Sequence, residues 1–350
     1  MVSAAAVFST GTVLRFAAQL PLVCLSIVFV AVEPLLRRRA EPEECDMRGK
    51  TCLVTGANCG IGFRTAERLA RAGATVLIAC RSPAKGAEAK KAIEKAARAE
   101  GRVEALDLDL SSLASVRRCA QSIGGRRIDV LVLNAGINAN TPTATHTDLP
   151  GCSLVFGVNF VAHWLLYDLL SRRALADDAR IVCLSSVMHH FARPAALLEC
   201  DGAVGPADYA ESKLAMNLLA RAITRRRDAR VGVAVNPGAV DSDIWRHVPF
   251  PADKLLGGVA AALFLTPDEG SATSVFAASA PLELDAEGQP PYLAPYAQPR
   301  GLPGASAFEY LGPFAGARPA FARLPKDEIE LADKLWARCS NLCGAFTAPL

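Results

Sequence analysis

Two side chains four positions apart, Tyr209 and Lys213, are of types that could transfer a proton. On a helix, this spacing stacks both side chains on one face. A free tyrosine has a pKa of about 10 and is a poor acid or base near neutral pH, but a nearby ammonium group stabilises its phenolate and lowers that pKa. The pair therefore predicts a general acid and base for an alcohol. Such pairs are common on protein surfaces, so other motifs must support it.

One supporting motif is a glycine-rich segment that follows the first predicted strand, with the sequence Thr55-Gly56-Ala57-Asn58-Cys59-Gly60-Ile61-Gly62. Its three glycines lie where the strand passes into a predicted helix. A dinucleotide pyrophosphate requires free backbone N–H groups and the positive end of a helix dipole, and side chains at these positions would block its approach. Because the glycines come between a strand and an amphipathic helix, the segment predicts a dinucleotide site.

Arg81 stands at the end of the second predicted strand, about twenty residues after the glycine-rich segment. An acidic residue there would favour NAD, whereas a guanidinium group suits the 2′-phosphate of NADP. The sequence therefore favours NADP, including its reduced form NADPH, over NAD. The alternative is that Arg81 is merely a solvated side chain.

The elements that must position these residues follow from an alternation of β-branched runs with longer helical patterns, which indicates parallel strands joined by crossover helices. The predicted strands are 51–55, 75–80, 103–108, 129–133, 180–185, 231–235 and, more weakly, 291–294. The predicted helices include 61–71, 83–100, 154–171 and 207–227. This order predicts an α/β fold, a doubly wound parallel sheet of the Rossmann-like kind, in a single domain. The Pro- and Gly-rich stretch 287–319 is expected to be an irregular cap or loop.

The amino-terminal residues differ from the rest, since residues 16–32 carry no charge and indicate a membrane segment. A spanning helix needs about 20 apolar residues, so this segment is short, and Pro21 weakens it. A membrane hairpin, a monotopic anchor and a cleaved signal or transit peptide are alternatives. Three arginines at 37–39 favour a cytosolic location for the following domain. We expect an anchor at 1–36, a linker at 37–48 and the Rossmann-like domain, with a carboxyl-terminal cap, at 49–350.

Composition excludes several classes of function. The formal net charge is only +3, and basic residues are interspersed with acidic ones, so nucleic acid is not expected as a partner. The eleven cysteines are scattered and form no CxxC pair, which indicates buried reduced thiols rather than a disulfide framework. Cys339 and Cys343 have no histidine near enough in sequence to complete a zinc pattern, so no metal is assigned.

Taken together, the motifs resemble those of the short-chain dehydrogenase/reductase family over roughly residues 50–245. The matching residues occur in the family's order and include, besides the glycine-rich segment, Asp109, Asn134-Ala135-Gly136, Asn159, Ser186, the Tyr209/Lys213 pair and Pro237-Gly238. Residues 79–82, the stretch Ser185-Ser186-Val187-Met188-His189-His190 and Leu335-Trp336 resemble the retinol-dehydrogenase-like, membrane-anchored branch.

The resemblance implies four catalytic residues. Tyr209 would be the general acid and base, and Ser186 would bind the substrate oxygen. Lys213 would hold the nicotinamide ribose and lower the pKa of Tyr209, while Asn159 would anchor its helix and a water. The implied cofactor contacts are Thr55, Gly56, Asn58, Gly60, Ile61, Gly62, Arg81, Asp109, Asn134, Ala135, Gly136, Tyr209, Lys213, Pro237 and Gly238.

The implied activity is NADP(H)-dependent interconversion of an alcohol and an aldehyde or ketone. The expected substrate is lipophilic, such as a retinoid, a steroid or a fatty aldehyde. The expected location is the membrane of the endoplasmic reticulum or another organelle, with the catalytic domain in the cytosol. The resemblance also implies a homodimer through the helices that follow the fourth and fifth strands.

Other interpretations remain at this point. The chain could be a catalytically silent cofactor-binding scaffold or sensor, although the intact tetrad argues against this. An epimerase or dehydratase acting on nucleotide sugars shares the Tyr/Lys pair, but the glycine spacing disfavours it. His189 and His190 are interpreted as ordinary loop histidines rather than substrate contacts. Arg225, Arg226 and Arg227 are interpreted as a solvated helix end rather than a phosphate or lipid site.

Overall fold

The computed structural model describes residues 45–98, 102–138, 145–149, 151–198, 207–226, 229–241, 265–296, 314–320, 322 and 324–348. The expected membrane segment and most of the expected linker lie outside the described residues. One described helical stretch, Leu154–Ser171, is long and apolar enough to cross a membrane. Nearly all of it is buried inside the protein, so its hydrophobicity is accounted for by the core.

The centre of the fold is an eight-stranded sheet with the order β3-β2-β1-β4-β5-β6-β7-β8. The strands are β1 Thr51–Thr55, β2 Thr75–Cys80, β3 Arg102–Asp107, β4 Ile128–Leu133, β5 Leu175–Leu184, β6 Val231–Val235, β7 Tyr292–Tyr296 and β8 Phe314–Ala320. The first seven pair in parallel, and β8 is an antiparallel edge strand. This confirms the doubly wound α/β fold.

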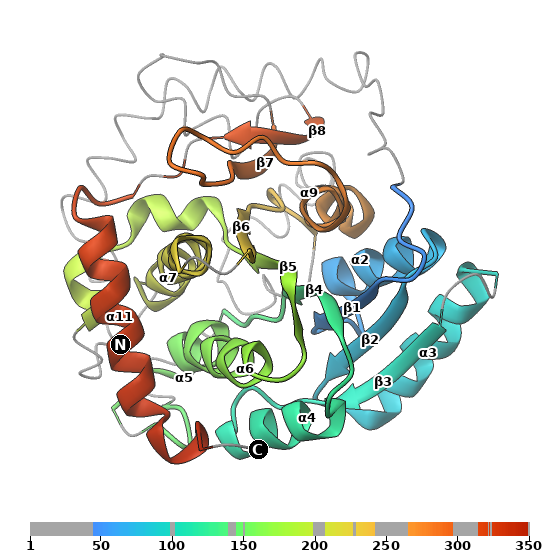
Figure 1. Cartoon of the computed structure of the whole chain (residues 1–350), viewed down its shortest axis with the longest axis horizontal. Coiled ribbons are helices and arrows are strands. Elements are labelled where there is room, and N and C mark those ends of the chain that lie inside the picture. Colours follow the sequence, from blue (N-terminus) through green and yellow to red (C-terminus); the bar gives the residue numbers. More distant parts are fainter. Residues whose placement is uncertain are drawn as a thin grey trace, which may run out of the picture.

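Helices cover both faces of this sheet, as Figure 1 shows. One face carries α2 Gly60–Arg71, α3 Pro83–Ala96 and α9 Pro267–Ser279, and the other carries α4 Leu113–Ile123, α6 Ala162–Ser171 and α7 Ala207–Arg225. A short helix α5, Leu154–Phe156, and a π-helix η2, Gly157–Val161, lead without interruption into α6.

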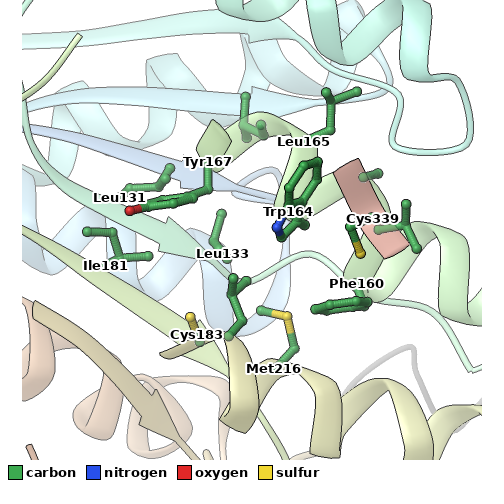
Figure 2. Close-up of a cluster of buried hydrophobic side chains, with 14 of the residues drawn as sticks. Leu131, Leu133, Phe160, Trp164, Leu165, Tyr167, Ile181, Cys183, Met216 and Cys339 are labelled. Atoms are coloured by element: carbon green, nitrogen blue, oxygen red, sulfur yellow. The ribbon is translucent and has the colours of Figure 1, made fainter. Parts of the chain in front are cut away.

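The central strands are buried on both sides, because successive side chains point to opposite faces and helices cover both faces. In β4, Leu131 and Leu133 belong to the apolar cluster under α6 and α7, whereas Val130 and Val132 belong to the cluster under α2 and α9. Figure 2 shows Leu131 and Leu133 beside Ile181 and Cys183 of β5, with aromatic residues of the helix above them. The central strands therefore read as continuous apolar runs in the sequence.

The carboxyl-terminal helix α11, Glu328–Leu342, forms an outer layer on α7 and α6 (Figure 1). Leu335 is buried, and the ring of Trp336 meets Trp164 edge to face at a centroid distance of 5.5 Å. The guanidinium carbon of Arg226 lies 3.6 Å from the centre of the Trp336 ring, and Arg225 pairs with Asp333 at 3.8 Å. Arg226 is exposed and Arg225 is half-buried, so this helix end is partly solvated, as predicted, and α11 also packs against it; Arg227 is outside the described residues.

Sequence and structure differ elsewhere too. The stretch 287–319, expected to be irregular, contains β7 and most of β8. The weak expectation of a strand at 291–294 is confirmed as β7, whereas β8 was not predicted because Gly316 and Pro319 are poor strand formers. None of the nine cysteines in the described part of the chain forms a disulfide, and seven of them are buried. For these nine, the prediction of reduced thiols is confirmed.

Candidate active site

The expected site residues gather at one edge of the sheet, because parallel strands all end at the same edge. Gly56 follows β1, Arg81 follows β2, Asn134 follows β4 and Ser186 follows β5, after Ser185. The chain order reverses between β1 and β4, since β2 lies on one side of β1 and β4 on the other. Open α/β sheets bind their ligands at such a switch point, outside the carboxyl ends of the strands.

The glycine-rich segment at this point has the backbone that its glycines predict. Gly56 and Gly60 have φ values of 66° and 58°, in the left-handed region that favours glycine. At Gly62, a Cβ atom would overlap the side-chain nitrogen of Asn134 and the carbonyl of Gly56. Cys59 precedes α2 without a side-chain cap, and the first turn of α2 has no acidic residue. The α2 amino terminus is therefore suited to a phosphate group; Asn58 and Ile61 lie beside it.

Thr55 and Asn134 fix the distance between β1 and β4 at the switch point. The Thr55 hydroxyl accepts hydrogen bonds from the backbone N–H groups of Asn134 at 2.9 Å and Ala135 at 3.0 Å. The Asn134 side chain donates to the Thr55 carbonyl at 2.7 Å. These bonds occupy Thr55 and Asn134 within the protein, so both support the cofactor cradle from behind. Sequence reasoning had interpreted them as contacts to the cofactor.

Arg81 and Asp109 lie further along the same edge. The Arg81 side chain is exposed and makes no hydrogen bond or ion pair with the described part of the protein. Asp109 follows β3 and accepts hydrogen bonds from the backbone and hydroxyl of Ser111 at 2.9 and 2.6 Å. Arg81 is thus available for an anionic ligand, while Asp109 shapes a turn.

Asn159 lies in the π-helix η2 and joins three segments. Its side-chain oxygen accepts from the backbone of Ile137 at 2.8 Å, and its side-chain nitrogen donates to the Ile137 carbonyl at 3.0 Å. The same nitrogen donates to the Ser212 hydroxyl at 3.1 Å, which in turn donates to the Tyr209 carbonyl at 2.8 Å. Asn159 therefore ties the loop after β4 to the first turns of α7. Single-turn π segments are frequent at functional sites.

Lys213 is buried beside Asn159 and Gly136. Its ammonium nitrogen donates to the carbonyl of Leu184 at 3.0 Å, and the hydroxyl of Ser185 donates to the carbonyl of Lys213 at 3.0 Å. A Cβ atom at Gly136 would lie 3.3 Å from the side-chain oxygen of Asn159 and 3.5 Å from the Lys213 nitrogen. Burial lowers the pKa of Lys213 to about 8, because the ammonium ion loses its hydration.

Tyr209 lies one helical turn before Lys213, and its ring centre is 5.4 Å from the Lys213 nitrogen. The side chain of Ser186 lies close enough to the Tyr209 hydroxyl to lower its pKa. Burial raises the pKa of Tyr209 to about 12, against a smaller lowering by Ser186. Desolvation is the larger of these two effects, because it penalises the phenolate more than Ser186 stabilises it.

Pro237 and Gly238 follow β6 and complete the edge. Gly238 has a φ of 85°, and its N–H donates to the side-chain oxygen of Asn236 at 2.9 Å. The side-chain nitrogen of Asn236 is buried without a partner among the described residues. The loop beyond Asp241 lies outside the described residues until Leu265.

Sequence reasoning did not assign three residues that the structure brings into this network. These are Ser212, which relays between Asn159 and Tyr209, Asn236, which shapes the turn after β6, and His163, which is buried between Thr55 and the Asn159 carbonyl. The sequence contained one signal for His163: it lies four residues, or one helical turn, after Asn159, and so on the same helix face. His189 has a structural role, in agreement with its interpretation as an ordinary histidine rather than a substrate contact: its side chain is buried, and its Nδ1 lies 2.7 Å from the Ser186 carbonyl.

The residues present fit a dinucleotide. The glycine-rich loop has no side chain over the amino terminus of α2, Gly136 leaves room beside Asn159 and Lys213, and Arg81 is an exposed cation at the far end. The Tyr209 and Ser186 hydroxyls, which lie near one another, are at the opposite end of this line. The arrangement can therefore hold a phosphate-bearing ligand at one end and exchange a proton with a bound oxygen at the other.

A protein-family model with the description 'short chain dehydrogenase' matches residues 50–250 of this chain. The polyprenol dehydrogenase of Mus musculus is 35% identical over 338 residues, which cover 91% of this chain and 92% of that protein. Retinol dehydrogenase 14 of Mus musculus is 36% identical over 271 residues, covering 69% of this chain and 76% of that protein.

Solved structures agree on the fold. A Mycobacterium paratuberculosis protein of uncharacterised function is 30% identical, with a TM-score of 0.65, covering 86% of this chain and 95% of its own. A blue fluorescent protein from a metagenomic library, in complex with NADPH, is 26% identical with a TM-score of 0.51, covering 67% of this chain and 92% of its own. A Brucella melitensis 3-ketoacyl-(acyl-carrier-protein) reductase complexed with NADH is 23% identical, with a TM-score of 0.52. The match covers 67% of this chain and 92% of the reductase, and it shows the fold alone.

Proposed function

The chain belongs to the short-chain dehydrogenase family and is an alcohol–carbonyl oxidoreductase, and from this premise we propose that it uses NADP(H) to interconvert a lipophilic alcohol and its aldehyde or ketone at Ser186, Tyr209, Lys213 and Asn159. The observation that carries the proposal is the convergence of these four side chains: Ser186 lies close enough to Tyr209 to lower its pKa, and Asn159 and Lys213 both lie beside Gly136.

Each residue has one task in the proposed reaction. The nicotinamide, when bound, supplies or accepts the hydride. The Ser186 hydroxyl donates a hydrogen bond to the substrate oxygen, where negative charge develops during reduction. The Tyr209 hydroxyl gives its proton to that oxygen in reduction and takes it back in oxidation. The Lys213 ammonium group holds the ribose hydroxyls, and Asn159 holds α7 in register with the loop at Ile137.

The preference for NADP rests on Arg81. A guanidinium group forms charge-assisted, bidentate hydrogen bonds with a phosphate group, and Arg81 has no protein partner in the described structure that would compete. NAD carries a hydroxyl group in place of this phosphate, so it would gain little from Arg81. The solved structure of the blue fluorescent protein, which is 26% identical to this chain, is a complex with NADPH and supports this preference.

The proposed substrate is a long apolar alcohol or carbonyl compound. Two relatives are named for polyprenol and retinol, which are both lipophilic alcohols. Such compounds partition into membranes, and the uncharged segment at 16–32 would hold the enzyme where its substrate is concentrated. We propose a membrane of the endoplasmic reticulum or another organelle, with the catalytic domain in the cytosol.

Replacing Tyr209 by Phe tests the proposed role of this residue. The Tyr209→Phe variant should lower kcat/KM by about 10³, because it removes the proton donor, and should leave NADPH affinity nearly unchanged. Turnover of retinal or a polyprenal is followed by NADPH oxidation, and binding by NADPH fluorescence. Tyr167→Phe, which removes the hydroxyl of a buried tyrosine two turns beyond Asn159, is the matched control and should keep full activity.

The same experiment separates the enzyme from the scaffold. A wild-type protein that binds NADPH tightly but turns over no lipophilic carbonyl compound would favour the cofactor-binding scaffold or sensor. Unchanged turnover in Tyr209→Phe would contradict the assigned acid and base.

A further inference from the structure

His163 is a fully buried histidine of α6 that the reaction outlined above does not use. Its Nδ1 lies 2.9 Å from the carbonyl oxygen of Asn159, and its Nε2 lies 3.0 Å from the hydroxyl oxygen of Thr55. The two partners are 104 residues apart in the sequence and belong to the two halves of the site. One ring therefore spans the distance between the catalytic asparagine and the end of β1.

The partners determine which ring nitrogen carries the proton. A backbone carbonyl can only accept, so Nδ1 must donate to Asn159, and Nε2 is then an acceptor. The Thr55 hydroxyl already accepts two N–H groups, from Asn134 and Ala135, and has its own proton to donate. Its candidate acceptors are His163 Nε2 at 3.0 Å and the Val132 carbonyl at 3.4 Å, and the nearer one is His163.

The charge state of the ring agrees with this assignment. Burial lowers the pKa of His163 to about 4, with a further lowering from the charge of Lys213. The ring is consequently neutral at physiological pH, with one donor and one acceptor, as the bridge requires.

The His163 contact to Asn159 lies where a π-helix passes into α6. In the π-helix η2, the N–H of Ala162 bonds to the carbonyl of Gly157, five residues earlier. The His163 side chain reaches back to the carbonyl of Asn159, at the wide turn where α6 begins. The orientation of Asn159 is thus set from both ends: Ile137 and Ser212 bind its side chain, and His163 binds its carbonyl.

We propose that His163 is a positioning residue that couples the cofactor cradle at Thr55 to the catalytic asparagine, Asn159. Through Thr55 the bridge reaches Asn134 and Ala135, which back the cradle; through Asn159 and Ser212 it reaches the carbonyl of Tyr209. The inference rests on the proposed function, because it concerns the residues that this function places around the nicotinamide.

Two conservative substitutions test separately the two hydrogen bonds of His163, one to the Asn159 carbonyl and one to the Thr55 hydroxyl. The side-chain nitrogen of an asparagine can occupy the place of Nδ1, so His163→Asn keeps the bond to Asn159 and loses the bond to Thr55. The longer glutamine amide can occupy the place of Nε2, so His163→Gln keeps the bond to Thr55 and loses the bond to Asn159. We therefore expect His163→Asn to impair NADPH binding and His163→Gln to impair turnover.

The full-length protein is used, with NADPH as the probe and retinal as the carbonyl compound. In His163→Asn we expect the NADPH dissociation constant to rise about tenfold with kcat within about twofold of wild type. In His163→Gln we expect kcat to fall about tenfold with the dissociation constant within about twofold. His163→Leu should show both losses.

A second buried histidine provides the control. The ring of His146 bridges the Leu110 carbonyl, at 2.9 Å, and the Asp148 backbone N–H, at 3.2 Å, without contacting Thr55 or Asn159. His146→Asn and His146→Gln should lower the thermal midpoint without separating binding from turnover.

Equal changes in kcat and in the dissociation constant in both His163 variants, or loss of thermal stability alone, would overturn the coupling and leave His163 a structural residue. Failure of the proposed function has a different signature, since the wild-type protein itself would show no turnover. The NADPH dissociation constants of the two variants would then still decide whether His163 supports the cradle.

Discussion

At the scale of single residues, burial changes the two groups that the sequence had paired. Burial raises the pKa of Tyr209 to about 12 and lowers that of Lys213 to about 8. The spacing of the two residues correctly predicted that they lie on one helix face, 5.4 Å apart from ring centre to nitrogen. The pKa change could not be read from the spacing, because desolvation depends on the strands and loops that enclose the pair.

Lys213 leads to a prediction about pH. Because its ammonium form is lost as the pH rises through about 8, NADPH binding and turnover should weaken above this pH. Stability should change in the opposite direction. The unfolded chain keeps the proton up to the ordinary pKa of 10.5, so it binds more protons than the folded protein between pH 8 and 10.5, and stability rises with pH there, by about 3 kcal/mol in total.

The test compares wild type with Lys213→Met, which has no titrating group at this position. The difference between their free energies of unfolding, measured in urea at pH 7.5 and at pH 10, should grow with pH in favour of wild type. A difference that is independent of pH would contradict the lowered pKa of Lys213.

Arg81 allows a second prediction at this scale. Arg81→Gln should raise the NADPH dissociation constant by about tenfold, because it removes a charge-assisted contact to the 2′-phosphate, and should leave that of NADH unchanged. Fluorescence titration with both nucleotides measures the two constants. Lys85→Gln, a neutralisation within the first turn of α3, is the control for a general charge effect. Equal weakening of NADPH and NADH binding would show that Arg81 does not contact the 2′-phosphate.

At the scale of elements, the glycine-rich segment and the first six strands could be predicted from the sequence, whereas η2 and β8 could not. The central strands are apolar on both faces, and positive φ at Gly56 and Gly60 leaves a clear residue signature. The π-helix carries no such signature: residues 154–171 have the periodicity of one continuous helix. The contact between Thr55 and His163 also escaped prediction, since it depends on how β1 and α6 pack.

The docking of α11 gives an element-scale prediction. Leu335→Ala should reduce the free energy of unfolding by about 3 kcal/mol, because it leaves a cavity where α11 meets α6 and α7. Ile329, on the same helix, is 52% exposed, so Ile329→Ala should cost less than about 0.5 kcal/mol. Urea denaturation of both variants measures the difference. Equal costs would contradict the docking of α11.

At the scale of the whole molecule, α11 lies on two of the helices through which the family resemblance implies a homodimer. A dimer built on α6 and α7 would therefore have to accommodate α11 or displace it from Trp164 and Tyr167. The catalytic edge of the sheet is independent of this surface, because its residues lie at the carboxyl ends of the strands. The described candidate residues Asn159, Ser186, Tyr209 and Lys213 therefore lie close together within one chain.

The most direct test of the central claim follows the hydride itself. The full-length protein is incubated with NADPH carrying deuterium at the transferable position and with retinal or a polyprenal, and the alcohol product is analysed by mass spectrometry. The account predicts one deuterium on the carbinol carbon, in an amount that Tyr209→Phe lowers by about 10³. Tight NADPH binding without deuterated alcohol from any lipophilic aldehyde or ketone would contradict it.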